Sequence, residues 1–318
     1  MCSYYRCITL AVALGLSMSA SHAQPHSLPP LDRYLITFES IPSPNFSRVN
    51  TIIRDDRGFL WFGTTKGLYK YDGYQMQVFP GQSPLDGIIT AMAKLDHESL
   101  LLGTGRGPWI FNLRTEQLTR FSTGSESSET RINDIAVDSS GTIWIGTSSQ
   151  GLIVCTPATR AARRFTASKG LSDNRITALL IDGPNRVWIG TVGGGLDALD
   201  PTTGHIRPYL TTGPSGPRHV TALCKDADGN LWVGTNDGLS VLDPGTGHVH
   251  QMDLHSYTKH TIMSIARDGT GRMWIGASDL GLLSSFHGTL TQLTPSGDAE
   301  RSLNTIMAVY PDPVASTP

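Results

Sequence analysis

The sequence predicts an all-β fold, a β-propeller of four-stranded blades, because one short motif recurs along most of its 318 residues. The motif Trp-x-Gly-Thr, with some substitutions, returns every 40 to 44 residues, a period typical of propeller blades. Its first positions are Trp61, Leu101, Trp144, Trp188, Trp232 and Trp274, and subtraction gives intervals of 40, 43, 44, 44 and 42 residues. The 34 glycines and six tryptophans also favour a protein with many turns and strands.

Each repeat unit has the pattern of four short strands separated by turn sequences. In the fourth unit we expect strands at 175–182, 187–191, 196–200 and 205–210, which are rich in β-branched or alternating apolar residues. The breaks between them are Pro-Asn, Gly-Gly-Gly and Asp-Pro-Thr-Thr-Gly, all common in turns. Four strands in about 40–45 residues, repeated around a ring, form the blades of a propeller.

The residues repeated in each unit are expected to have structural roles. The five tryptophans of the motif should fill the space between neighbouring blades. An aspartate six residues before each tryptophan should accept hydrogen bonds from the amides of the turn between the first two strands. These aspartates are Asp55, Asp138, Asp182, Asp226 and Asp268.

The turn at 226–237 contains several oxygen ligands and resembles a calcium loop at first sight. An EF-hand loop has glycine at its sixth position and glutamate at its twelfth, whereas Gly229 is fourth here and Asp237 is twelfth. The same turn recurs in the other units, and this recurrence favours a structural turn over a metal site.

Six repeat units are visible, and the sequence at 304–313 matches the first strand of a seventh. In that match Ile306 takes the position of Val49, the branched aliphatic residue twelve positions before the motif. A segment near the N-terminus, 34–40, matches a fourth strand that would close the ring. We therefore predict a seven-bladed type of propeller with six complete repeats and an incomplete last blade, whose open strand edges favour a dimer.

The first 23 residues have the features of a secretory signal peptide. Arg6 precedes a short apolar run, and Ser21 and Ala23 are the small residues of a cleavage site. The run is shorter than the roughly 20 apolar residues that a membrane anchor needs. We expect a signal peptide at 1–23, a propeller domain at 24–318 without a membrane span, and a periplasmic or secreted location.

Composition and motifs argue against several functional classes. The formal net charge is −2 and no basic cluster occurs, so we do not expect a nucleic-acid partner. No catalytic or cofactor motif is recognisable, so we expect neither enzymatic activity nor a cofactor. His248 and His250 lie on one face of an expected outer strand near His255, and we favour an exposed edge strand over a metal site. Cys155 and Cys224 lie two units apart, which predicts two separate buried thiols.

The unit at 170–204 combines Gly-Leu-Ser-Asp-Asn-Arg-Ile-Thr-Ala-Leu-Leu-Ile-Asp, Trp-Ile-Gly-Thr and Gly-Gly-Leu-Asp-Ala-Leu-Asp-Pro-Thr-Thr-Gly. It resembles the two-component-regulator propeller repeat. The resemblance implies the periplasmic sensor region of hybrid histidine kinases and related membrane-bound signalling proteins. In these proteins, paired seven-bladed propellers and a small β-sandwich precede a membrane span and a transmitter, and several members respond to oligosaccharides. This sequence shows one propeller and no transmitter motif, so we expect a sensor-like module without the signalling output.

One position in each unit indicates a candidate ligand site. The residue just before the first-strand aliphatic should stand at the mouth of the central channel. It is basic in four units, at Arg48, Arg131, Arg175 and His219, and these four residues are called the collar below. The other units have Ile88, Thr261 and Thr305 at this position.

The chemistry of the collar predicts an anionic ligand. Guanidinium groups bind carboxylates and sulfates through paired hydrogen bonds, so an acidic oligosaccharide, or another propeller or sensor domain, is the expected partner. Asn50 and Asn133, two positions after collar arginines, would add polar lining to the channel. The alternative is that the arginines only pair with nearby acids such as Asp134 and Asp173.

The irregular second unit places Arg106 and Trp109 at one turn, where an exposed tryptophan would contact a sugar ring or a partner. The alternative is that Trp109 replaces the missing motif tryptophan in the core. Two further functional classes stay open: a propeller enzyme of lyase or glycosidase type, and a truncated gene product without a function. Turnover by the intact protein would favour the enzyme.

Overall fold

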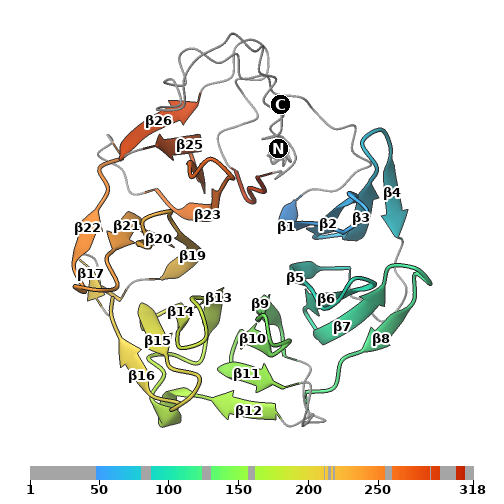
Figure 1. Ribbon diagram of the computed structural model, residues 1–318, viewed down its shortest axis with the longest axis horizontal. Coiled ribbons are helices and arrows are strands. Elements are labelled where there is room, and N and C mark those ends of the chain that lie inside the picture. Colours follow the sequence, from blue (N-terminus) through green and yellow to red (C-terminus); the bar gives the residue numbers. More distant parts are fainter. Residues whose placement is uncertain are drawn as a thin grey trace, which may run out of the picture.

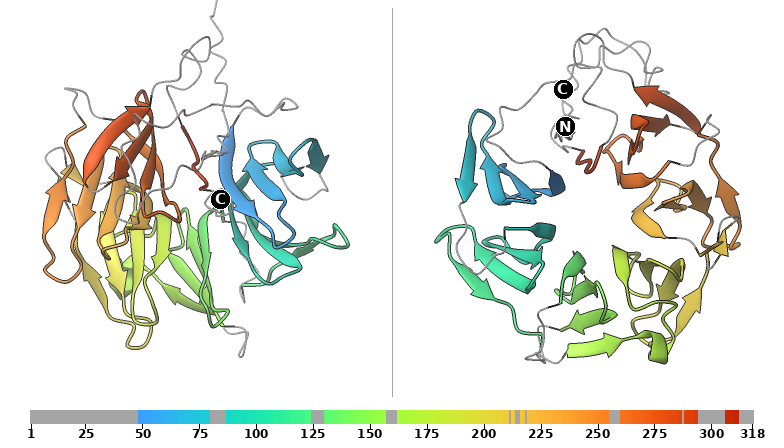
Figure 2. Two further views of the ribbon diagram at one scale, coloured as in Figure 1. Left: turned by 45° about the horizontal axis from the view of Figure 1, so that its top comes forward. Right: turned by 180° about the vertical axis from the view of Figure 1, so that it is seen from behind.

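A computed structural model describes residues 48–79, 87–123, 130–156, 162–210, 212–213, 216–217, 219–254, 260–286, 288–293 and 306–311. Six four-stranded antiparallel sheets stand around a central axis as the blades of a propeller (Figure 1). The same ring is seen from behind in Figure 2. The predicted all-β fold and its four-stranded blades are therefore confirmed.

The strands follow the chain from the inside of each blade to the outside. Blade 1 consists of β1 (Val49–Arg54), β2 (Leu60–Thr64), β3 (Gly67–Tyr71) and β4 (Met76–Phe79), and blade 2 of β5 (Ile89–Lys94), β6 (Ser99–Thr104), β7 (Gly107–Asn112) and β8 (Leu118–Arg120). Blade 3 consists of β9 (Ile132–Val137), β10 (Ile143–Thr147), β11 (Leu152–Cys155) and β12 (Ala162–Phe165).

Blade 4 consists of β13 (Ile176–Ile181), β14 (Val187–Thr191), β15 (Leu196–Leu199) and β16 (Ile206–Pro208), and it is followed by the short pair β17 (Thr212–Gly213) and β18 (Gly216–Pro217). Blade 5 consists of β19 (Val220–Lys225), β20 (Leu231–Thr235), β21 (Gly238–Leu242) and β22 (Val249–Gln251), and blade 6 of β23 (Ile262–Arg267), β24 (Met273–Ala277), β25 (Gly281–Phe286) and β26 (Thr289–Leu293). In the described residues the only helix is a 3-10 turn, η2 (Ala167–Lys169).

The core lies between the blades, where the motif tryptophans are buried. Trp188 is fully buried and packs with Val220, Leu231 and Val233 of blade 5. Trp144 packs in the same way against blade 4. These large apolar rings join one sheet to the next, as the sequence predicted.

The repeated aspartate forms the turn and also holds the tryptophan. Asp226 Oδ1 accepts hydrogen bonds from the amides of Asp228 and Asn230, and Asp226 Oδ2 accepts one from Trp232 Nε1 at 2.9 Å. The same bond from indole to carboxylate occurs in blades 1, 3, 4 and 6, at 2.7–3.2 Å. The apparent calcium loop is therefore a structural turn whose carboxylate is already engaged.

We expect Asp226→Ala to lower the free energy of unfolding by about 2 kcal/mol, because a charged acceptor with several donors, one of them a largely buried indole, is lost. Urea denaturation measures the change. Asp228→Ala is the matched control, since Asp228 is exposed in the same turn and contributes its backbone amide, and its effect should stay below about 0.5 kcal/mol. Equal losses in the two variants would contradict the assigned role.

The predicted seven-bladed closure needs correction, because the described residues form six blades and not seven. Ile306 nevertheless occupies the position expected for a seventh first strand: it is 1% exposed and packs against Trp274 of blade 6. Ala308 packs against the Val49 side of blade 1. Residues 306–311, red in Figure 1, therefore lie between blades 6 and 1, but they form no strand because no ladder partner exists among the described residues.

The remaining predictions concern the N-terminal segments, a membrane span and the two cysteines. The signal peptide at 1–23 and the closing strand at 34–40 lie outside the described residues. No helix in the described part is long and apolar enough to cross a membrane. Cys155 and Cys224 are separate free thiols, the first buried and the second partly exposed, and burial raises the pKa of Cys224 to about 11.

Candidate functional site

The collar residues occupy one equivalent position at the point where the inner strand of a blade begins. Each backbone carbonyl there accepts a hydrogen bond from the loop between the second and third strands of the same blade. The pairs are Thr65 N to Arg48 O, Ser148 N to Arg131 O, Val192 N to Arg175 O and Asn236 N to His219 O, at 2.9–3.1 Å. The inner strands β1, β9, β13 and β19 surround the central axis (Figure 1), and each collar residue directly precedes one of them.

Arg175 and His219, on neighbouring blades 4 and 5, are close enough to influence each other. Burial lowers the pKa of His219, and the positive charge of Arg175 lowers it further, so this imidazole is neutral at pH 7. Arg175 binds Asp173 through Nη2 at 2.6 Å and through Nε at 3.1 Å. The predicted alternative, an arginine paired with a loop acid, is therefore realised at Arg175.

Arg48 and Arg131 lie on blades 1 and 3, and blade 2 between them has Ile88 at the same position. Both arginines are exposed. No arginine of the described residues pairs with Asp134: its carboxylate accepts amide hydrogen bonds from Leu179 and Ile135, both at 2.8 Å or less. Arg131 is therefore an exposed cation whose proposed acidic neighbour has other partners.

The loops between second and third strands add further charge to this face. Arg106 is exposed in the loop of blade 2, and the exposed Lys66 has the equivalent place in blade 1. Blade 5 has Asp237 in that place. Lys66 is not among the candidates named from the sequence. Its spacing nevertheless marks it, since it follows Trp61 by five residues, as Arg106 follows Leu101.

Asn50 and Asn133 do not simply line the channel, because each joins two blades. Asn50 Nδ2 donates to Ile89 O of blade 2 at 2.8 Å, and Asn133 Nδ2 donates to Ile176 O of blade 4 at 2.7 Å. Both residues lie at a β-bulge of the inner strand, and a bulge redirects a side chain away from its own ladder. Thr90, Thr177 and Thr221 make the equivalent bond in blades 2, 4 and 5.

Trp109 is not the exposed contact residue that the sequence allowed. It is 9% exposed and packs with Trp61, Leu100 and Phe111 between blades 1 and 2. It therefore adds to the core between blades 1 and 2, whereas Leu101, which stands at the motif position, packs between blades 2 and 3. Trp109 thus does not take the place of the missing motif tryptophan, and its Nε1 has no hydrogen-bond partner among the described residues. Only Arg106 of this pair is available on the surface.

A buried carboxylate supports the loop that carries Asp173 and Arg175. Asp197 of β15 is fully buried and accepts hydrogen bonds from Ser172 N at 2.8 Å and Ser172 Oγ at 2.6 Å. Burial raises the pKa of Asp197, although the bonds from Ser172 oppose this. The sequence Gly-Gly-Leu-Asp contains this residue, but the other blades have an uncharged side chain at the same place, so no repeat signal marked it.

The outer strand of blade 5 carries His248 and His250, and both are exposed. His255 lies outside the described residues. Among the residues that the structure describes, no group of three or more histidine, cysteine or acidic side chains is arranged to hold a metal ion.

Two family models match parts of the chain. The two component regulator propeller model matches residues 43–66, 170–193 and 214–237. The model of the SMP-30/gluconolactonase/LRE-like region matches residues 67–152. No curated protein matches the sequence significantly.

Solved structures similar to this chain include sensor regions and lyases. The extracellular domain of BT4673 from B. thetaiotaomicron, assigned to a hybrid two component system, is 25% identical with a TM-score of 0.71, over 81% of this chain and 35% of that one. The corresponding domain of BT3049 is 22% identical, with a TM-score of 0.70 over 84% and 37%. Virginiamycin B lyase from Staphylococcus aureus is 10% identical, with a TM-score of 0.63 over 80% and 88%, which shows a shared fold alone.

This chain thus spans about a third of the length of the two extracellular domains it resembles. The repeated turn, the buried tryptophans and three separate matches to one repeat model agree with each other. The chain is a β-propeller in which three separate segments match the two component regulator propeller repeat.

Proposed function

We propose that the protein is an extracytoplasmic recognition module, periplasmic or secreted, that binds an anionic ligand at the collar without catalysing a reaction. The repeated placement of Arg48, Arg131 and Arg175 at the start of inner strands supports this proposal. The family match and the likeness to extracellular domains of two component systems support a sensor-like role. An acidic oligosaccharide suits the collar because guanidinium groups pair with carboxylates and sulfates.

The collar arginines should contribute unequally to binding. Arg175 already pairs with Asp173, so a ligand must compete for its guanidinium. Arg131 is exposed and Asp134 is directed to backbone amides, so its guanidinium is the better anchor. A second propeller or sensor domain that presents acidic residues would use the same groups.

We expect Arg131→Gln to weaken binding of a galacturonate tetramer about tenfold, and Arg175→Gln to weaken it less, because a charge-assisted hydrogen bond is lost in each. Isothermal titration calorimetry on the folded secreted chain measures both. Arg207→Gln is the control, since Arg207 is exposed on the outer strand of blade 4 and should not change the Kd. Unchanged affinity in Arg131→Gln and Arg48→Gln, or cleavage of the tetramer seen by mass spectrometry, would contradict the proposal.

A further inference from the structure

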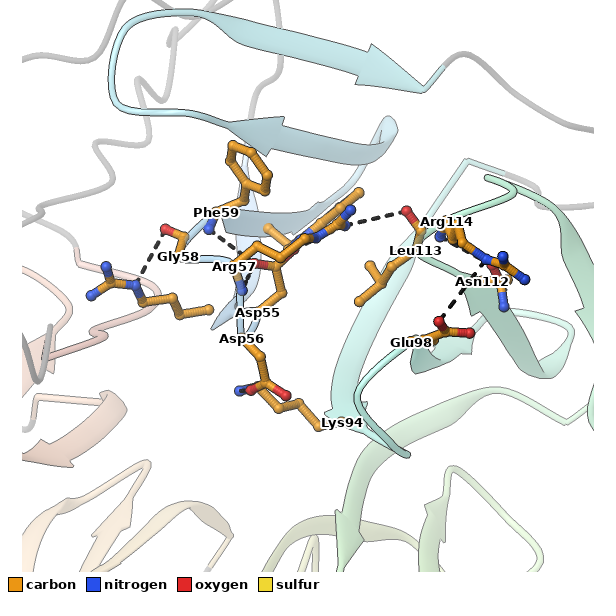
Figure 3. A network of polar contacts seen from close by, with 12 residues as sticks. Asp55, Asp56, Arg57, Gly58, Phe59, Lys94, Glu98, Asn112, Leu113 and Arg114 are labelled. Atoms are coloured by element: carbon orange, nitrogen blue, oxygen red, sulfur yellow. Dashed lines mark hydrogen bonds and ion pairs between the residues drawn. The ribbon is translucent and has the colours of Figure 1, made fainter.

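Side chains close the seam between blades 1 and 2 on the face opposite the collar (Figure 3). Arg57 Nη2 of blade 1 donates to Leu113 O of blade 2 at 3.2 Å. Lys94 Nζ of blade 2 lies 2.7 Å from Asp56 Oδ1 of blade 1. The seam between blades 4 and 5 has an ion pair from the equivalent lysine, Lys225, to Asp182, which takes the place of Asp55 and not of Asp56.

The seam between blades 3 and 4 lacks the arginine and the lysine that cross the other two seams. Counted from the motif tryptophan, Ser140 stands where blade 1 has Arg57, and Ser139 stands where it has Asp56. Ile181 takes the place of Lys94. No side chain of these three can form the ion pair or reach across as an arginine does, and a cavity of about 580 Å³ lies at this seam.

The walls of this cavity are mostly apolar. Val154 and Ile181 face it from two blades, Pro184 and Pro201 come from turns of blade 4, and Trp144 lies beneath. Hydroxyl groups complete the rim, from Ser139, Ser140, Thr142, Thr156 and Thr202. Its volume lies within the range of about 300–1,000 Å³ that is usual for small-molecule sites.

The two charged residues of the cavity differ in what they can bind. Asp138 is already occupied, since it accepts hydrogen bonds from Ser140, Thr142 and Trp144 Nε1. Arg163 is the one basic residue of the lining, and no acidic residue in the described part of the chain pairs with it. Its guanidinium lies 4.4 Å from the Phe165 ring centroid and next to Gly204 in a turn of blade 4, so it is held across the outer side of the seam.

We propose that the seam between blades 3 and 4 binds a small aromatic acid, with its ring against the apolar walls and its carboxylate or sulfonate on Arg163. An apolar ring suits Val154, Ile181 and Pro184, and a single anionic group matches the one available cation. This site is separate from the collar, because it is formed by loops at the opposite ends of the strands.

The test uses 8-anilino-1-naphthalenesulfonate, an aromatic sulfonate that becomes fluorescent in apolar sites, titrated into the folded secreted chain. We expect saturable binding at one site. Arg163→Gln should weaken it about tenfold through the lost charge, and Ser139→Phe should weaken it at least as much by filling the cavity. Ser139 and Arg163 are both exposed, so the two variants should fold, and thermal melts check this independently for each.

Two controls separate this site from others. Arg207→Gln removes an equally exposed arginine that stacks on Tyr209 but does not line the cavity, and it should leave the Kd unchanged. Arg131→Gln tests whether the probe sits at the collar instead. The proposal is overturned if Arg163→Gln and Ser139→Phe both bind within twofold of the parent, or if either control weakens binding as much as Arg163→Gln does.

Discussion

Replacement of Gly190 by alanine is expected to lower the free energy of unfolding by about 3 kcal/mol, because overpacking forces the neighbouring blade to move. A Cβ atom at this position would lie 2.5 Å from Val220 Cγ1 and 3.0 Å from Val220 Cβ. The glycine of Trp-x-Gly-Thr therefore lets the inner strand of the next blade pack directly against the backbone. The same close approach occurs at Gly63, Gly103, Gly146, Gly234 and Gly276.

A second substitution tests this explanation directly. Val220→Ala alone removes a fully buried side chain and should cost about 2 kcal/mol. In the double variant the space vacated by Val220 receives the new methyl group. The double variant should therefore lose at least about 1 kcal/mol less free energy of unfolding than the sum of the two single losses, as a double-mutant cycle measured in urea would show. Gly245→Ala is the control, since Gly245 is exposed in an outer turn. Strict additivity at Gly190 and Val220 would contradict the packing argument.

The glycine contact also explains why the repeat could be predicted so well. Each motif residue has a partner at a fixed sequence distance: the aspartate holds its own tryptophan, and the glycine receives the aliphatic residue of the next blade. Such constraints leave regular spacings, so the strands expected in the fourth unit differ from β13–β16 by two residues or fewer at each end. Ile306 obeys the same rule, since it packs over Gly276.

The wrong predictions from the sequence concern features that depend on contacts with residues far along the chain, which a local sequence pattern does not show. A strand exists only with a ladder partner, so a first-strand sequence at 306–311 was not sufficient for a seventh blade among the described residues. Asn50 was placed in the channel because a bulge, which redirects its side chain to Ile89 O, leaves no mark in the alternation of apolar residues. For the collar, the sequence located the positions, but only the structure distinguishes Arg175, paired with Asp173, from Arg131.

Asp134 should make the stability of the propeller fall as the pH rises through weakly acidic values. This residue lies on the inner strand of blade 3, and burial raises its pKa to about 6, although amide hydrogen bonds from Leu179 and Ile135 oppose the shift. The ordinary value is 3.8, so between about pH 4 and pH 6 the folded state binds more protons than the unfolded state. The free energy of unfolding therefore decreases across this window, by up to about 3 kcal/mol for a shift of this size.

Asp134→Ala isolates this effect, because alanine already occupies this register position in blades 2, 4 and 5. These alanines are Ala91, Ala178 and Ala222. The variant loses two hydrogen bonds at every pH, so the quantity to follow is the change with pH. Relative to the parent protein, its free energy of unfolding should rise between pH 4 and pH 7, as urea denaturation at several pH values would show.

A control of opposite sign comes from Asp200, whose pKa is lowered by hydrogen bonds from Thr203 and Thr202 in an outer turn. A carboxylate with a lowered pKa stabilises the fold above its unfolded pKa, and this contribution is lost as the pH falls. Asp200→Ala should therefore become less stable relative to the parent as the pH rises, the reverse of Asp134→Ala. If the free energies of unfolding of the two variants, relative to the parent, instead change with pH in the same direction, the pKa of Asp134 is not raised. The amide hydrogen bonds from Leu179 and Ile135 would then outweigh the effect of burial on this carboxyl group.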